Sequence, residues 1–224
     1  MDGTIVDTEP FWIEAETRMI ESFGGTWTSE QAVQMVGLGL EDAAEILREA
    51  GVDLPVDAIV QKLTDEVIAS LNGRGAPFRP GAVELLRSLR EAGVRMGLVT
   101  MSLRRMADAV VEQIGFDAFD VIVSGDSARR PKPFPDPYLQ AAEALGVDIG
   151  RTVVIEDSPA GLSAGLSSGA FALGVPHIVP LAGLGADELW PTLEGRTAGD
   201  VMSLFETGAT VRERGAVREQ EDVR

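Results

Sequence analysis

The feature that most constrains the fold is a regular alternation of short apolar runs with helical segments. Four strand-like runs occupy residues 96–100, 119–124, 152–156 and 170–175. Segments with helical periodicity accompany them over residues 82–92, 104–114, 137–145 and 159–168. Strands that alternate with helices of this kind form a parallel sheet with helices on both faces, so the chain is predicted to be an α/β protein.

A purely helical stretch precedes most of this alternating region. Apolar residues recur at spacings of one, three or four over residues 11–23, 43–50 and 59–71, as amphipathic helices require. Glycines follow each of these segments, and glycine is the usual residue at a helix end. The stretch is therefore predicted to be a helical insert.

These patterns predict a division of the chain into three parts. We expect residues 1–10 and 79–206 to form the α/β core and residues 11–78 to form a helical cap. The tail over residues 207–224 has mixed charge and little apolar content, and it is expected to be frayed or disordered.

Composition excludes several classes of function. The 224 residues include 19 Lys and Arg against 36 Asp and Glu, and a formal charge of −17 makes the chain a poor ligand for nucleic acid or anionic membranes. The absence of Cys excludes thiolate catalysis and disulfides, and the single His177 excludes sites with several histidines. No leader peptide or membrane span is recognisable. The expectation is a cytoplasmic monomer that acts on a small molecule.

Polar side chains follow the predicted strands, at the edge where α/β sheets bind ligands. Thr100 ends the first strand, Lys132 lies in a proline-flanked loop after the second, and Glu156 and Asp157 end the third. Asp2 stands at the start of the chain, before the insert. The set contains carboxylates, a hydroxyl and one ammonium.

This set suits Mg²⁺ together with a phosphoryl group. Mg²⁺ prefers carboxylate and carbonyl oxygens, and Glu156 and Asp157 would provide them. Lys132 and Thr100 would bind phosphoryl oxygens. Each motif also has a plain structural interpretation: a turn at Asp2, a solvated loop lysine, or a helix start after Glu156. Two adjacent carboxylates at a buried strand end are the least ordinary feature, because they need a compensating cation.

In this order the motifs resemble those of the haloacid dehalogenase-like hydrolase superfamily. The family motif D-x-D-G-T is matched from its second position by Asp2-Gly3-Thr4, and the chain continues Ile5 to Pro10 as that family commonly does. Lys132–Asp136 matches K-P-x-P-[DE], and Glu156–Gly161 matches E-D-S-x-x-G. The similarity is greatest to the phosphatase and β-phosphoglucomutase-like branch, and it spans residues 1 to about 176. It implies a Rossmann-like parallel sheet with an inserted α-helical cap.

The resemblance also implies roles for the candidate residues. Asp2 would be the general acid and base, and its backbone carbonyl would join Glu156 and Asp157 around Mg²⁺. Thr100 and Lys132 would hold the phosphoryl oxygens. The family nucleophile is the first Asp of D-x-D-G-T, which would stand directly before Met1 and follow an apolar strand. The expectation is therefore that about six apolar residues and an Asp are encoded upstream, and that residues 1–224 alone turn over negligibly.

Several activities remain open from the sequence. A Mg²⁺-dependent phosphomonoesterase that uses an aspartyl-phosphate intermediate is the first expectation, and a hexose-phosphate mutase or a catalytically silent binding module are the alternatives. A dehalogenase is disfavoured, because that branch does not need the Glu156-Asp157 pair. An esterase is disfavoured too: G-x-S-x-G occurs at residues 161–165 and 165–169, but Asp157 to Ala160 separate the strand from the first glycine.

Overall fold

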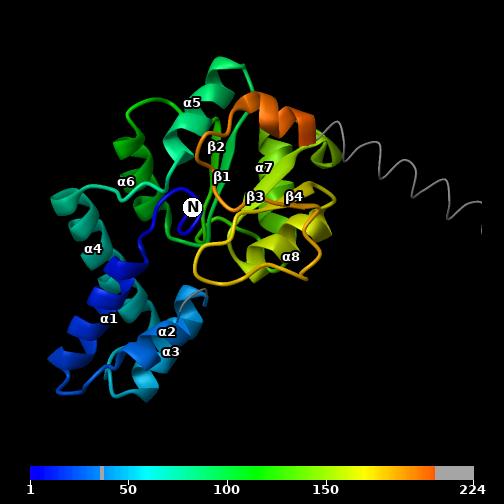
Figure 1. The fold of residues 1–224 in the computed structure, drawn as a ribbon. Helices are drawn as coiled ribbons and strands as arrows, with labels where there is room; N and C mark the ends of the chain where they lie inside the picture. The colour runs from blue at the N-terminus through cyan, green and yellow to red at the C-terminus, as the bar shows by residue number, and fades with distance from the viewer. Residues whose placement is uncertain (36–37, 205–224) are drawn as a thin grey trace, which may run out of the picture.

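The computed structural model describes residues 1–35 and 38–204. Figure 1 shows a group of helices at the lower left and a larger body of sheet and helix above it. The lower group contains α1 (Glu9–Ser22), α2 (Ser29–Met35), α3 (Leu40–Glu49) and α4 (Val56–Arg74). The tail predicted to fray lies outside the described residues, and the division into domains stays a prediction.

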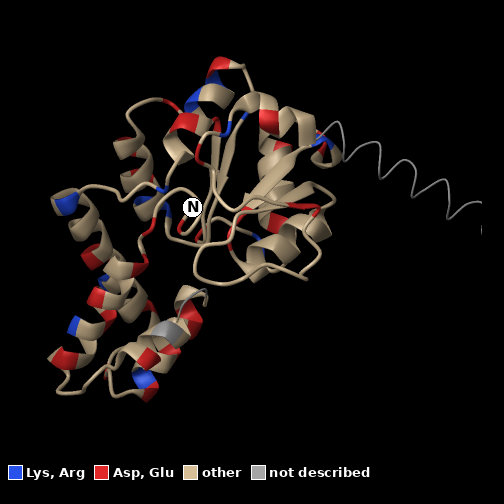
Figure 2. Cartoon of the chain, in the orientation of Figure 1, with Lys and Arg blue, Asp and Glu red and all other residues tan. Residues whose placement is uncertain are grey.

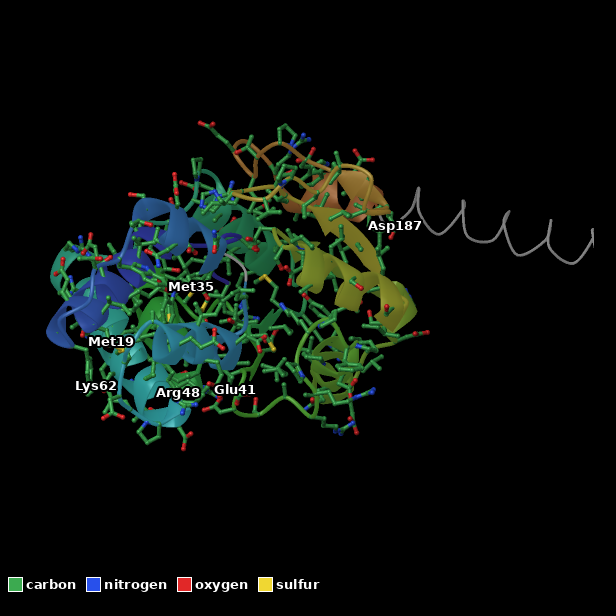
Figure 3. All side chains as sticks on the ribbon, turned by 90° about the horizontal axis from the view of Figure 1, so that it is seen from below. Met19, Met35, Glu41, Arg48, Lys62 and Asp187 are labelled. Atoms are coloured by element: carbon green, nitrogen blue, oxygen red, sulfur yellow. The ribbon has the colours of Figure 1, made fainter. Side chains whose placement is uncertain are left out.

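The lower helices pack through the apolar stripes that the sequence displays. Helix α4 contacts both α1 and α3, and it buries Ile59, Leu63, Val67 and Leu71 at the four-residue spacing of one helix face. Seen from below in Figure 3, Met19 lies within this group of helices, whereas the exposed Arg48 and Lys62 lie toward its outer edge. Helices α1, α3 and α4 lie where the periodicity of apolar residues predicts them. The apolar stripe of α2 is too short to be recognised in the sequence.

The upper body contains the remaining elements. Its helices are α5 (Ala82–Glu91), α6 (Arg104–Ile114), α7 (Asp136–Leu145), the short η1 (Ile149–Arg151), α8 (Pro159–Ser168) and a last helix that begins at residue 198. Its strands are β1 (Gly97–Val99), β2 (Val121–Val123), β3 (Val153–Glu156), β4 (Phe171–Gly174) and β5 (Glu188–Leu189). The expected α/β class is confirmed, and β5 is a two-residue strand that the sequence did not reveal.

The strands form two parallel sheets rather than one. Strand β1 pairs with β2 with Leu98 opposite Ile122, while β3 pairs with β4 and β4 with β5. Every one of these pairs is parallel, as predicted. Among the described residues no strand joins β1 to β3, so the sheet is interrupted at its centre.

The turn after β3 is held by a helix cap. The Ser158 hydroxyl accepts a hydrogen bond from the Gly161 amide at 3.1 Å, and Pro159 follows in the first turn of α8. The helix ends at Gly169, whose φ of +89° suits a residue without a side chain. This cap fixes Asp157 in the turn between α8 and strand β3, which ends at Glu156.

Charged side chains are distributed over both bodies. Figure 2 shows Lys and Arg interspersed with Asp and Glu on the helices, with no face given over to basic residues in the view shown. None of the helices in the described part of the chain is long and apolar enough to cross a membrane.

Candidate active site

The first eight residues form a tight loop at the carboxyl ends of β1 and β3. The Met1 carbonyl accepts a hydrogen bond from the Ile5 amide at 2.8 Å, which curls the chain around Gly3. Gly3 has φ +71°, a conformation that other residues rarely adopt. The loop touches the ends of both half-sheets, because Asp2 binds a residue after β1 and Thr4 binds a residue after β3.

Asp2 is held by two hydroxyl groups. Ser102 Oγ donates to one carboxylate oxygen at 2.7 Å, and Thr8 Oγ1 donates to the other. Ser102 is itself fixed, since its amide donates to Thr100 Oγ1 at 3.1 Å. These contacts orient the Asp2 carboxylate and connect it with Thr100.

Lys132 lies in a buried ion pair with Glu156. Its Nζ donates to Glu156 Oε1 and to the Val99 carbonyl oxygen at 3.1 Å, and the Lys132 and Glu156 side chains are only 8% and 5% exposed. Tyr138 Oη donates to the same Glu156 oxygen. Burial alone would raise the pKa of Glu156, but the charges of Lys132 and of the chain's amino terminus outweigh it and lower the pKa below its usual value.

Asp157 has fewer partners than its neighbour. Thr4 Oγ1 donates to Asp157 Oδ1 at 2.7 Å. Burial, and then the charge of Glu156, raise the pKa of Asp157 above its usual value. A Cβ placed on Gly3 would lie 1.9 Å from Asp157 Oδ2, so this carboxylate oxygen faces the backbone of the N-terminal loop. An additional cation beside Asp157 would relieve this unfavourable charge.

A fourth carboxyl group faces the site from the first turn of α1. Glu9 is partly buried, and its pKa rises to about 7 through burial and through the charges of Asp2, Asp7 and Asp157. The sequence alone did not single out Glu9, although its place next to the Asp2 motif was a possible signal.

The oxygen ligands near Asp157 are compatible in chemical type with Mg²⁺. In residues 1–35 and 38–204 no group of three or more His, Cys, Asp or Glu side chains is placed to enclose an ion, as a structural zinc site would require. Mg²⁺ needs only one or two carboxylates, because water and substrate phosphate complete its shell. The Asp157 carboxylate and the Asp2 carbonyl meet that requirement in chemical type.

The structure brings the five candidate residues together. Asp2 is linked to Thr100 through Ser102, and Lys132 contacts the end of β1 through Val99. Glu156 ends β3, and Asp157 follows it directly. Residues that sequence reasoning missed hold these groups in place: Thr4, Thr8, Ser102 and Tyr138. The carboxylates that their side chains contact are distant in sequence for all but Thr8, which lies six positions from Asp2.

The G-x-S-x-G sequences do not form a nucleophile elbow. Ser163 and Ser167 are exposed on α8, which starts two residues before the first glycine. An elbow requires a strand that runs directly into that glycine. This geometry removes the esterase alternative.

Comparisons with known proteins agree with the site. The family described as haloacid dehalogenase-like hydrolase matches residues 1–175. The phosphorylated carbohydrates phosphatase of Thermotoga maritima is 31% identical over 179 residues, which cover 79% of this chain and 83% of that protein. The plasmid phosphoglycolate phosphatase of Cupriavidus necator is 32% identical over 216 residues, 88% of this chain and 89% of that protein.

A solved structure shares the same architecture. The crystal structure of CbbY from Rhodobacter sphaeroides in complex with phosphate is 26% identical, with a TM-score of 0.81 over 90% of this chain and 96% of that chain. The family resemblance seen in the sequence motifs is confirmed.

Proposed function

We propose, since the chain belongs to the haloacid dehalogenase-like hydrolase family, that it hydrolyses phosphate monoesters of a small metabolite with Mg²⁺. The observation that carries this proposal is the meeting of Asp2, Asp157 and Lys132 at the carboxyl ends of β1 and β3. The relatives from T. maritima and C. necator are named as phosphatases of small phosphorylated compounds, which supports the same class of substrate.

Asp157 and the backbone carbonyl of Asp2 would hold Mg²⁺, with Glu156 beside them. The bound ion would neutralise negative charge on the phosphoryl oxygens. Glu156 already accepts hydrogen bonds from Lys132, Tyr138 and Ser158, so its main role would be to position Lys132 rather than to bind the ion directly. Lys132 would donate to one phosphoryl oxygen and Thr100 to another.

The reaction would proceed through an aspartyl-phosphate. A carboxylate directly before Met1 would attack phosphorus while the ester P–O bond breaks, and Asp2 would give its proton to the leaving alcohol oxygen. Water would then attack phosphorus, lose its proton to Asp2, and release phosphate and the free carboxylate. Ser102 and Thr8 would keep the Asp2 carboxylate aimed at the reacting oxygens through both steps.

The test is phosphate release by two forms of the chain. One form is residues 1–224, and the other carries an N-terminal extension of five valines and isoleucines followed by aspartate. We expect release from sugar and polyol phosphates only by the extended form and only with Mg²⁺. A matched extension that ends in asparagine should be inactive, because it cannot form the acyl phosphate.

Two results would contradict the proposal. Equal turnover by residues 1–224 would show that no attacking carboxylate before Met1 is needed. Undiminished turnover in EDTA would show that the reaction does not require Mg²⁺. Interconversion of sugar phosphates without phosphate release would identify a mutase, while phosphate binding without any turnover in the extended form would identify a silent binding module.

A further inference from the structure

Helix α6 of the upper body lies against helix α4 of the lower group (Figure 1). Arg105, in the first turn of α6, reaches across to two residues of α4 that lie one turn apart. Its Nη2 donates to the Gln61 carbonyl oxygen at 2.9 Å and to Gln61 Oε1 at 2.7 Å, and its Nη1 donates to an Asp65 carboxylate oxygen. Among residues 1–35 and 38–204 this is the one ion pair between a helix of the lower group and a helix of the upper body.

A second side chain of α6 crosses to α4 at the other end of the contact. Gln113 Nε2 donates to the Leu71 carbonyl oxygen at 3.3 Å, and Gln113 Oε1 accepts from the Ala76 amide at 2.6 Å. Ala76 belongs to the connection through which the chain leaves α4 and returns to the upper body. The chain itself therefore holds this end of the contact, whereas Arg105 holds the end about two turns away.

Arg105 restricts the angle between the two helices more than it stabilises the fold. Its side chain is 35% exposed and that of Asp65 is 71% exposed, and ion pairs this exposed contribute little to stability. The two helices share one apolar core, which includes Val67 of α4 and Met106 of α6 and would keep them packed without the ion pair. The planar guanidinium binds Gln61 and Asp65 together, so it restrains orientation.

The first turn of α6 continues directly from the loop that holds Asp2. Ser102 Oγ donates to Asp2 Oδ2 at 2.7 Å, and the Ser102 carbonyl oxygen accepts from the Gly125 amide at 3.0 Å. Leu103 follows as the N-cap residue of α6. Arg105 thus lies three positions after the residue that orients the carboxylate, on a segment held at both ends.

The second hydroxyl on Asp2 comes from the start of the lower group. Thr8 Oγ1 donates to Asp2 Oδ1, and Thr8 is the N-cap residue of α1. Helix α1 is joined to α4 by packing and by Arg74, which donates to both carboxylate oxygens of Glu14 at 3.0 and 2.8 Å. A displacement of α4 is therefore transmitted through α1 to the Thr8 hydroxyl.

These contacts form a closed ring through Asp2, Thr8, α1, α4, Arg105, α6 and Ser102. We propose that Arg105 is a positioning residue for Asp2: by fixing the angle between α4 and α6, it keeps the Thr8 and Ser102 hydroxyls on one carboxylate. Without Arg105, α4 would turn about the Gln113 end of the contact, and Asp2 would lose the Thr8 hydrogen bond. The role of Asp2 as general acid rests on the proposed function, but the ring of contacts does not.

The test is the ¹³C resonance of the Asp2 carboxyl group in the full chain with labelled aspartate, which Asp2→Asn identifies by removing it. Thr8→Val removes one hydroxyl and gives the reference shift. We expect Arg105→Ala to shift the resonance in the same direction, because the same hydrogen bond is lost. Arg104→Ala is the matched control, since Arg104 pairs with Asp108 within α6 and should leave the resonance unchanged.

Removal of the partners on α4 tests the same contact from the other side. Gln61→Ala combined with Asp65→Ala should shift the Asp2 resonance as Arg105→Ala does, and all three changes together should shift it by less than the sum of the separate effects. Gln61 and Asp65 are exposed, so this pair decides the question even if Arg105→Ala does not fold. Lys62→Ala, at an exposed position between them, is the control and should have no effect.

Kinetics in the extended form of the chain test the consequence for catalysis. A polyol phosphate needs a proton on its leaving oxygen, whereas p-nitrophenolate leaves without one, and kcat/KM reports the first step for both. We expect Arg105→Ala to lower kcat/KM for the polyol phosphate by roughly tenfold, through kcat rather than KM. For p-nitrophenyl phosphate the loss should be about twofold or less.

Two spectroscopic results would overturn the proposal: an unshifted Asp2 resonance in Arg105→Ala, or an equal shift in Arg104→Ala. Equal losses of kcat/KM for the two substrates would overturn it too, because they would show that Arg105 acts on the fold as a whole. If the extended parent chain hydrolyses neither substrate, the proposed function fails, and the Asp2 resonance alone decides whether Arg105 positions this carboxylate.

Discussion

Gly3 determines how closely the N-terminal loop approaches Asp157. Its φ is +71°, and a Cβ at this position would lie only 1.9 Å from Asp157 Oδ2, which leaves no room for a side chain. Gly24 offers a control, since its φ of +80° is similar and no atom lies within 4 Å of the corresponding position. Comparison of the two glycines separates backbone strain from collision with the site.

We expect Gly3→Ala to destabilise the fold by about 2 kcal/mol more than Gly24→Ala, because both are strained by positive φ but only the first displaces Asp157. Urea unfolding of the two variants against the parent chain measures the difference. Equal losses of unfolding free energy would show that Asp157 does not need the close approach of Gly3.

At this scale the sequence reveals the candidate residues that the structure brings together, but not the residues that hold them in place. Asp2, Thr100, Lys132 and Asp157 could be identified because each lies at a predicted strand end or within a motif. Ser102 lies 100 positions from Asp2, and its bond to that carboxylate depends on the tertiary fold. No local pattern marks such a partner.

Helix α1 carries an acidic residue on its buried face. Glu16 is 5% exposed, and its position in the stripe with Trp12, Met19 and Ile20 follows from helical spacing. Burial, and then the charge of Glu9, raise the pKa of Glu16 to about 8, although the Trp27 indole beside it lowers the pKa somewhat. Periodicity predicted this helix, but it could not show that a carboxyl group would be enclosed.

A raised pKa makes the fold less stable as pH increases. The folded chain retains the Glu16 proton up to about pH 8, while the unfolded chain releases it near 4.5, so the stabilisation present below pH 4.5 is lost as pH rises toward 8. We expect Glu16→Gln to remove this dependence. Between pH 5 and pH 8 the free energy of unfolding of the variant should therefore rise relative to that of the parent by on the order of 3 kcal/mol.

Chemical unfolding across this pH range is the measurement. Glu21→Gln is the matched control, because Glu21 is exposed on the same helix and should leave the pH dependence unchanged. The same pH profile for Glu16→Gln as for the parent chain would refute a buried protonated carboxyl at this position.

For the whole molecule, the sequence predicts the class and the element order well. The alternation from residue 79 onward led to parallel strands, although they form two sheets and not one, and the periodic stripes led to α1, α3 and α4. The interruption between β1 and β3 could not be predicted from the elements alone, because pairing across a sheet joins segments that are distant in sequence. At this interruption Met1 and residues of both β1 and β3 line one apolar cavity.

The central claim is that Asp157 and Lys132 act on one phosphate together with Mg²⁺. Calorimetric titration of inorganic phosphate into the full chain, with and without Mg²⁺, tests it most directly, with Asp53→Asn as an exposed control on the helical side. We predict that Mg²⁺ tightens phosphate binding by roughly tenfold in the parent and in Asp53→Asn but not in Asp157→Asn. The claim would be contradicted if phosphate bound equally tightly with and without Mg²⁺. It would also be contradicted if Mg²⁺ tightened phosphate binding in Asp157→Asn as much as in the parent.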